Sequence, residues 1–421
     1  MSPTERRDDS TTFTPNQRLA VHRWFRYSAG FSGAWAADVV AEALPRGGVV
    51  FDPFAGVATT LIAAQSQGCD AVGVEAHPLV TRIARAKLDW STPPAAFSTL
   101  AEAVHQAAAT LPTTPLDAYP ELVRRIFEDD ALAELDRLKR AIDAHADPDT
   151  PAGRLCWLAL LAILRSCSGA GTAPWQYVLP DRRKAQVASP LPSFAAQCRL
   201  MAEDMASLQR QAPAPGAARL LQADARTLEG VADASVDLVL TSPPYPNNYD
   251  YADATRVELS FLGEVERWAD LHDAVRQHLL RSCSQHTRKE RLEVEALLDD
   301  PLLGPIRPAL DDVCARLSAL RAERKGHKAY DTMIAAYFAD LARVWQALGR
   351  VCRPGARACF VIGDSAPYGV YVPVDLWLGV LAEATGFAVE GFEQTRARNI
   401  KWKNRKHRVP LKEGHLRVRR V

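Results

Sequence analysis

Residues 49–60 read VVFDPFAGVATT, and their order predicts the first strand, turn and helix of an α/β fold. The apolar residues 49–51 are typical of a buried parallel strand, and they lead into the acid Asp52. A turn of small residues follows, in which Gly56 would let the backbone approach a ligand closely. A helical pattern begins at Thr59. Because ligands bind at the carboxyl ends of such strands, we expect a binding site at this turn.

The next predicted strand also ends in an acid. Residues 71–74 are apolar and lead into Glu75, about 20 residues after the first turn. In nucleotide-binding α/β folds, a carboxylate at this place accepts hydrogen bonds from ribose hydroxyls. A glycine turn alone is weak evidence for a site. A strand, turn, helix, strand and acid in this order are much less expected by chance.

A second motif lies far downstream, in the run VDLVLTSPPYPNNYDY of residues 236–251. A buried strand leads into Ser242, Pro243, Pro244 and Tyr245. The prolines have no backbone N–H and hold the chain extended and rigid. The tetrad presents a hydroxyl, carbonyls and an aromatic face, which suit a flat ligand with polar edges such as a nucleobase. Taken alone, the motif is equally compatible with a strand end where the tyrosine only packs.

Together the two motifs resemble those of the amino-group DNA methyltransferases, which use S-adenosylmethionine. The family's cofactor motif, Asp-Pro-Phe-x-Gly-x-Gly-Thr-Thr, is similar to residues 52–60, and its catalytic motif, Asp/Asn/Ser-Pro-Pro-Tyr, to residues 242–245. The resemblance covers most of the chain from Arg18 onward, apart from the helical insertions. Ala58 departs from it, because the family usually has its second glycine there. A methyl group is expected to crowd the loop beside the methionine part of the cofactor.

The resemblance implies a set of cofactor-binding residues. In the family, an acid at the position of Asp224 bonds the adenine amino group, and helix capping is the alternative role for this residue. Phe31 would cover the methionine end of the cofactor, with core packing as an equal alternative. The full set is Phe31, Asp52, Phe54, Gly56, Thr60, Glu75, Asp224 and Ala225.

The resemblance also implies how the tetrad Ser242, Pro243, Pro244 and Tyr245 would act. A base must leave the duplex to reach such a site, at a cost of a few kcal/mol. Stacking on Tyr245 is worth about 1–3 kcal/mol, which is comparable. Ser242 and the Pro243 carbonyl would accept hydrogen bonds from the exocyclic amine and free its lone pair for the methyl group. Methylation at cytosine C5 needs a thiolate, and the chain contains no Pro-Cys dipeptide.

The serine at the first position of the tetrad favours cytosine N4 as the target. Family members with aspartate there more often methylate adenine N6, so adenine N6 remains the main alternative. Methylation of RNA is a further alternative. A catalytically silent DNA-binding protein is a hypothesis of a different class, favoured only by Ala58 and opposed by the intact tetrad.

Composition is typical of a cytoplasmic enzyme. The chain has 421 residues, 48% of them hydrophobic, and a formal net charge of +1. No apolar run approaches the ~18 residues of a membrane span. The eight cysteines are scattered, without a Cys-x-x-Cys pair, so we expect no structural metal.

Positive charge is concentrated at the C-terminus. Residues 396–421 contain eleven arginines and lysines and one acid, Glu413. Such a segment can follow phosphates, and double-stranded DNA is therefore the expected partner. A solvated basic tail is the alternative. A restriction endonuclease partner and the oligomeric state are left open. The residues expected to contact DNA are Asn247, Asn248, Tyr249, Arg398, Lys401, Lys403 and Arg405.

The order of strands and helices predicts a doubly wound, mostly parallel sheet. The resemblance implies a Rossmann-like, seven-stranded methyltransferase domain with helical insertions. Either insertion could recognise the target sequence, and the first could instead cover the cleft. The expected segments are a disordered N-terminus at 1–15, a discontinuous catalytic domain at 16–91, 216–263 and 331–395, helical insertions at 92–215 and 264–330, and a basic C-terminal segment at 396–421.

Overall fold

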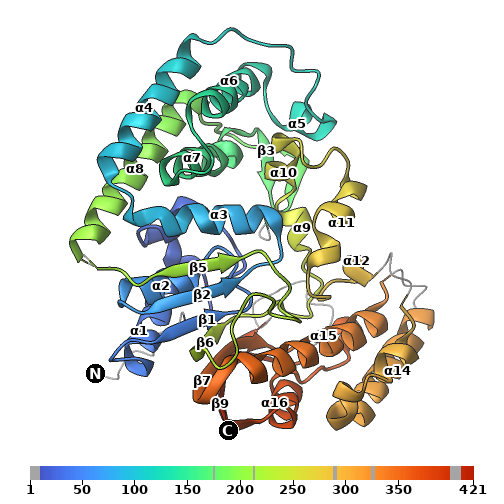
Figure 1. Cartoon of the computed structure of the whole chain (residues 1–421). Helices are drawn as coiled ribbons and strands as arrows, with labels where there is room; N and C mark the ends of the chain where they lie inside the picture. The colour runs from blue at the N-terminus through green and yellow to red at the C-terminus, as the bar shows by residue number, and fades with distance from the viewer. Residues whose placement is uncertain (1–9, 174–175, 212–213, 288–291, 324–327, 399–408) are drawn as a thin grey trace, which may run out of the picture.

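The computed structural model describes residues 10–173, 176–211, 214–287, 292–323, 328–398 and 409–421 (Figure 1). In these ranges the chain forms a sheet of seven strands in the order β5-β2-β1-β6-β7-β9-β8. Strand β9 runs antiparallel to both β7 and β8, and the pairings among the other neighbouring strands are parallel. This is the Rossmann-like, mostly parallel sheet that the sequence predicts. The bounds are β1 Val49–Asp52, β2 Asp70–Val74, β5 Ala218–Leu221, β6 Val236–Thr241, β7 Cys352–Gly363, β8 Phe387–Arg398 and β9 Leu411–Arg420.

Helices cover both faces of the sheet because alternate strand residues are apolar on each side. Val50 and Leu240 belong to the hydrophobic cluster beneath α1 (Gly33–Ala43), α2 (Thr59–Ser66) and α3 (Pro78–Leu88). Phe51 and Val239 belong to the opposite cluster. There they pack with α15 (Tyr330–Val351) and α16 (Val374–Ala384).

The segment between β2 and β5 adds a group of helices beyond α3, in the upper part of Figure 1. Its central helix is α7 (Pro151–Cys167), which has apolar side chains on nearly all sides. Leu155 and Leu161 of this helix are buried in the same hydrophobic cluster as the side chains of α1, α2 and α3. The group also contains a small hairpin, a departure from the wholly helical insertion that we expect. Its elements are α4 Pro94–Thr110, α5 Glu121–Ile126, α6 Asp129–His145, α7 Pro151–Cys167, β3 Ala170–Thr172, β4 Val178–Arg183 and α8 Pro190–Gln211.

The segment between β6 and α15 is built from short helices and one long helix. Leu298, Leu310 and Val313 are buried against α15 in the second cluster, so this segment extends the sheet's own core. Its helices are α9 Tyr251–Ala254, α10 Arg256–Leu262, α11 Leu271–Ala274, α12 Ser284–Thr287, α13 Val294–Leu298 and α14 Arg307–Glu323. Short 3-10 turns lie at Thr14–Arg18, His22–Trp24, Asp89–Ser91, Trp268–Asp270, Arg276–His278, Pro301–Ile306 and Pro367–Gly369.

The basic C-terminal segment is not a free tail where the structure describes it. Strand β9 lies inside the sheet, between β7 and β8. Leu416 and Val418 are buried in the core, while Arg417 and Arg419 alternate with them on the other face. This alternation is the pattern of a strand, and it is hidden when the segment is judged by its charge.

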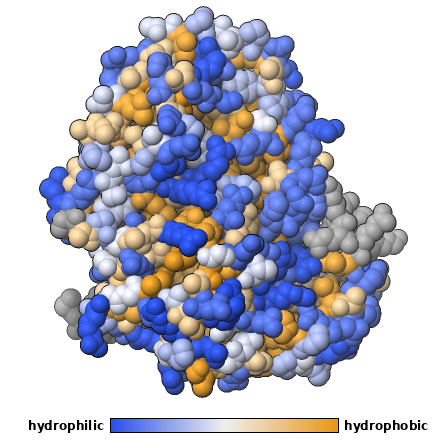
Figure 2. Space-filling model, viewed as in Figure 1, coloured by the Kyte–Doolittle hydropathy of each residue, from blue (hydrophilic) through white to orange (hydrophobic). Residues whose placement is uncertain are grey.

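The outer surface is mixed in character. On the face in Figure 2, hydrophilic residues are spread between smaller hydrophobic areas. Within the described ranges, no helix combines the length and the apolar character needed to cross a membrane.

Candidate active site

The strand ends that the sequence predicts to bind ligands surround one cavity of about 1110 Å³. They meet because β5, β2, β1 and β6 are parallel neighbours, which brings their carboxyl ends to one rim. Ligand pockets typically measure about 300–1000 Å³, so this cavity has room for more than one small ligand. The predicted residues that line it are Phe54, Gly56, Glu75, Asp224, Ala225, Ser242, Pro243, Pro244, Tyr245, Asn247, Tyr249 and Arg398.

The turn between β1 and α2 contains two residues in the left-handed region. Gly56 has a φ of +52° and Ala58 a φ of +67°. This conformation explains why glycine is favoured at both positions. The Ala58 methyl, however, is fully buried in the hydrophobic cluster and does not line the cavity. The expectation that it crowds a cofactor is therefore not supported.

Asp52 and Thr60 lie behind the cavity wall. The Asp52 carboxylate accepts hydrogen bonds from the hydroxyls of Thr60 and Thr241, at 2.7 and 2.6 Å, and from the backbone N–H of Phe54 at 3.0 Å. Burial raises the pKa of Asp52 to about 6. This carboxylate ties the end of β1 to α2 and to the end of β6, and so joins the two motifs.

Glu75 lies at the rim, just after β2. Its two carboxylate oxygens accept backbone hydrogen bonds from Gly56 and His77, each at 2.8 Å. Burial raises the pKa of Glu75 to about 7. Part of the side chain faces the cavity, where the carboxylate can accept further hydrogen bonds.

Asp224 lines the cavity near the end of β5. Its carboxylate forms an ion pair with Arg226 at 2.7 Å and accepts the backbone N–H of the same residue at 2.8 Å. Arg226 also reaches the fully buried Asp340, at 3.3 Å. Asp224 therefore stabilises the turn at residues 225–230 and caps no helix, and its ligand-binding role stays a prediction.

The tetrad forms the cavity wall at the end of β6. The Ser242 hydroxyl donates to the Val361 carbonyl of β7 at 3.1 Å, which leaves its oxygen lone pairs able to accept. The Arg398 guanidinium lies over the Tyr245 ring, 5.0 Å from its centroid. Burial raises the pKa of Tyr245, so its phenol is neutral at physiological pH.

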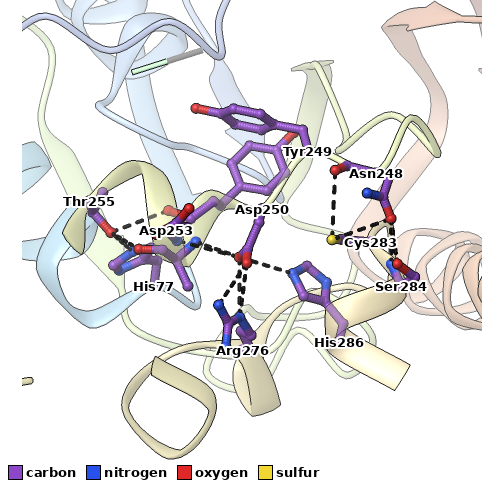
Figure 3. A network of polar contacts seen from close by, with 12 residues as sticks. His77, Asn248, Tyr249, Asp250, Asp253, Thr255, Arg276, Cys283, Ser284 and His286 are labelled. Carbon is purple, nitrogen blue, oxygen red and sulfur yellow. Dashed lines mark hydrogen bonds and ion pairs between the residues drawn. The ribbon is translucent and has the colours of Figure 1, made fainter. Parts of the chain in front are cut away.

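The loop after the tetrad is held by the second insertion (Figure 3). Asn248 has a φ of +65°, and its side-chain oxygen accepts hydrogen bonds from the Ser284 backbone and hydroxyl at 3.0 and 2.6 Å. Asp250 forms an ion pair with Arg276 at 2.7 Å, and both side chains are buried. The Tyr249 ring stacks on Tyr177, with centroids 5.7 Å apart.

These contacts revise the expected DNA-contacting loop. Asn247 is exposed at the cavity, as a DNA contact requires. Asn248 and Tyr249 make the internal contacts described above, Tyr249 also lines the cavity, and a DNA contact by either residue stays a prediction. Their polar and aromatic character therefore has a structural use that the sequence alone does not reveal.

Most of the described cations of the C-terminal segment pair with acids on neighbouring elements. Arg396 and Arg398 pair with the buried Glu413, at 2.7 and 3.2 Å. Lys412 pairs with Asp375 at 2.6 Å. Arg398 lies in the cavity wall, and its contact with DNA stays a prediction. The other candidates, Lys401, Lys403 and Arg405, lie outside the described residues.

Besides Asp52 and Thr60, a third cofactor candidate does not line the cavity, and several lining residues are missed by the sequence. Phe31 is 4% exposed and packs edge-on against Trp35 in the core, with ring centroids 5.7 Å apart. It does not line the cavity, so core packing is its role. The missed residues include Tyr27, Tyr251, His278 and Glu413. Two of them have a sequence signal: Tyr27 lies in the aromatic run of residues 25–31, and Tyr251 ends the run that contains the tetrad.

The rim has the chemistry of a nucleoside site. Carboxylates at the ends of adjacent strands can accept hydrogen bonds from ribose hydroxyls and an amino group, and the glycine turn permits close approach. Glu75, Asp224 and Gly56 could hold such a cofactor. Among the described residues, no group of three or more histidines, cysteines or acids is placed to bind a metal ion.

Comparisons with known proteins agree with this geometry. A model of the family described as DNA methylase matches residues 4–86, which carry the glycine turn and Glu75. The Type II methyltransferase M.BsoBI of Geobacillus stearothermophilus is 24% identical to this chain, over 89% of the chain and 80% of its own length. The N-terminal fifth of the chain is thus similar to the DNA methylase family model, and most of the chain is similar to a Type II methyltransferase.

The Type II methyltransferase M.AvaI of Nostoc sp. is a second relative. It is 26% identical, over 90% of this chain and 81% of its own length. Among solved structures, the rRNA methyltransferase aviRa from Streptomyces viridochromogenes is 11% identical and aligns over 98% of this chain and 94% of its own, with a TM-score of 0.33. A TM-score this low carries no argument about the fold.

Proposed function

We propose that this protein transfers a methyl group from S-adenosylmethionine to the exocyclic N4 of a cytosine flipped out of duplex DNA. One observation carries the proposal: the tetrad at residues 242–245 and the glycine turn with Glu75 line the same cavity. Methyl transfer requires a base-holding surface and a nucleoside-binding surface within reach of each other. The family supplies the class of substrate.

S-adenosylmethionine, when bound, would supply a methyl group on a positively charged sulfur. Glu75 would accept hydrogen bonds from its ribose hydroxyls, and Asp224 would accept one from its adenine amino group. Gly56 would permit close approach of the backbone. Asp52 and Thr60 would keep the turn in position from behind, because their hydrogen bond at 2.7 Å is buried.

The tetrad would hold and orient the target base. The Ser242 hydroxyl donates a hydrogen bond to the Val361 carbonyl, so its oxygen is oriented to accept a hydrogen bond from the base amine. The Pro243 carbonyl would accept the second amine proton. These two bonds favour a pyramidal nitrogen with a usable lone pair. Stacking on Tyr245 would contribute about 1–3 kcal/mol, enough to offset much of the cost of flipping.

The state of the cysteines supports an amino target over cytosine C5. All eight cysteines are free and buried. Burial raises the pKa of Cys283, which lies beside the loop that follows the tetrad, to about 12. Attack on a cytosine ring needs a thiolate, and such a pKa keeps this thiol protonated at neutral pH.

Two features support the finer parts of the proposal. Ser242 at the first tetrad position favours cytosine N4 over adenine N6, which is the second candidate. Both curated relatives are named Type II methyltransferases, which supports site-specific methylation of DNA. We extend the proposal to a cognate restriction endonuclease that cuts the same site.

The deciding experiment is expression in a bacterial host that lacks DNA methylation, followed by sequencing for modified bases. We expect N4-methylcytosine at one short sequence, and a smaller modified fraction with the Tyr245→Ala variant. Detection of N6-methyladenine would show that adenine N6, the second candidate, is the methylated atom. Unmodified DNA, together with methylation of structured RNA by the purified protein, would overturn the proposal.

A further inference from the structure

We infer that Arg398, held by Glu413, is a positioning residue that fixes the ring of Tyr245 for stacking on the target base. The inference rests on the proposed function for the meaning of that stacking, but its geometric part concerns the free protein. Both side chains line the cavity, and neither role follows from the sequence motifs.

Glu413 is the anchor of the arrangement. It lies on β9 within the sheet and is 1% exposed. One carboxylate oxygen accepts hydrogen bonds from Arg396 at 2.7 and 3.1 Å, and the other forms an ion pair with the Arg398 Nε at 3.2 Å. A buried carboxylate is stable as an ion only with such partners. Glu413 therefore holds Arg398 in one place.

Arg398 is held at three points. Besides Glu413, its Nη1 donates to the Asp364 carbonyl at 2.9 Å. Its guanidinium lies 5.0 Å from the centroid of the Tyr245 ring, within the range of a cation–π contact. The side chain thus links β8, the end of β7 and the tetrad. A guanidinium with fixed hydrogen bonds is a rigid surface on which an aromatic ring can rest.

Gly363, at the end of β7, leaves the space for this contact. A Cβ at this position would lie 2.8 Å from the Arg398 Nη1 and 3.1 Å from the Tyr245 Cε2. Either side chain would have to move to admit it. The Tyr245 ring and the Arg398 guanidinium therefore both pack against the backbone of Gly363, and this packing limits the positions that the ring can take.

The consequence is a preorganised stacking surface. With Arg398 over one face of the Tyr245 ring, the opposite face is the one that would receive the base. Glu413 carries one negative charge against the guanidiniums of Arg396 and Arg398, so a net positive charge remains at this edge of the cavity. A ring that is held before the base arrives loses less freedom on stacking.

The first test compares the purified Arg398→Met variant with the purified wild-type protein. The substrate is unmethylated plasmid DNA, prepared from a host that lacks DNA methylation. Arg398→Met keeps an unbranched side chain and removes the guanidinium together with its hydrogen bonds. We expect kcat to fall about tenfold to a hundredfold, as misplacement of a reacting group does, while KM for S-adenosylmethionine stays within about twofold. Glu413→Gln should have a similar effect, and the double variant should be no worse than the single ones.

The matched control is Arg417→Met, because Arg417 pairs with Glu393 on the same hairpin but is half exposed and outside the cavity. It should leave kcat unchanged. Unchanged or increased kcat in Arg398→Met would overturn the inference. So would a loss confined to DNA affinity with a reduced salt dependence, which is the signature of a phosphate contact.

A second measurement needs no DNA. In free protein with selectively ¹³C-labelled tyrosine, Arg398→Met should shift the ring signals of Tyr245 and speed its ring flips, whereas Arg417→Met should not. Unchanged Tyr245 signals would refute the positioning role. The proposed function would fail in a different way. The Tyr245 ring signals would then still depend on Arg398, but the wild-type protein would methylate no DNA.

Discussion

The Glu75 carboxylate accepts the backbone N–H of Gly56 at 2.8 Å, and this bond joins the end of β2 to the turn after β1. It sets the acid at the rim where a ribose would bind. Because burial raises the pKa of Glu75 from its ordinary 4.5 to about 7, this contact titrates near neutrality. Two effects of opposite direction should follow as the pH rises.

The affinity for S-adenosylmethionine should increase with pH. If ribose hydroxyls require the carboxylate form, a group with a pKa of about 7 predicts a Kd about tenfold lower at pH 8 than at pH 6. The raised pKa also means that the folded, ligand-free protein binds the proton more tightly than the unfolded chain. Its stability should therefore decline as the pH rises from 4.5 to about 7.

Calorimetric titration of the cofactor across this pH range measures the first effect, and thermal unfolding without ligand measures the second. Glu75→Gln is the control: it should bind the cofactor more weakly and lose most of the pH dependence. An equally steep dependence in Glu75→Gln would assign the titration to another group, such as Asp52.

Replacement of Tyr245 should separate catalysis from cofactor binding. Tyr245→Ala removes a stacking surface worth about 1–3 kcal/mol, so we expect kcat to fall by about fivefold to 150-fold. Tyr245→Phe keeps the ring and should retain much more activity. Cofactor affinity, measured by calorimetry, should change little in either variant. An equal loss of affinity and activity would mean that Tyr245 is structural.

Ala58→Gly should leave cofactor binding nearly unchanged, because the Ala58 methyl lies in the core and not in the cavity. Two effects on stability oppose each other. Relief of the left-handed conformation, with its φ of +67°, gains about 1 kcal/mol, and the lost burial of one methyl costs about 0.8 kcal/mol. The expected net change is small. A several-fold gain in S-adenosylmethionine affinity would show that the methyl does obstruct the site.

The Asp250–Arg276 ion pair should be important for stability, since both side chains are buried. Arg276→Met leaves the Asp250 carboxylate buried without its partner, and we expect a loss of about 3–5 kcal/mol in urea unfolding. Arg417→Met, which breaks the more exposed pair with Glu393, should cost about 0–1 kcal/mol. A similar small cost for both variants would show that water reaches Asp250.

The local motifs could be predicted because their information is short-range. The apolar run 49–51, the glycine turn and the rigid tetrad each specify a strand end from a few adjacent residues. Parallel strands bring such ends together whatever lies between them, so the shared rim of Glu75, Gly56 and Ser242 was predictable from order alone.

The errors arise where a partner comes from a distant part of the chain. Phe31 looks like a cofactor contact until α1 brings Trp35 against it. Asn248 looks like a base contact until Ser284 donates to its side chain. The C-terminal arginines look like a phosphate-binding tail until β9 enters the sheet and brings acids from other strands beside them.

The sequence by itself therefore determined the sheet, the cofactor turn and the base-holding tetrad, because residue periodicity and turn chemistry act between neighbours. The tertiary structure alone decided which side chains complete the cavity. Arg398 reaches Tyr245 across 153 residues of chain only because β8, β9, β7 and β6 lie side by side in one sheet. Contacts of that kind depend on the packing of whole elements, and no local pattern encodes them.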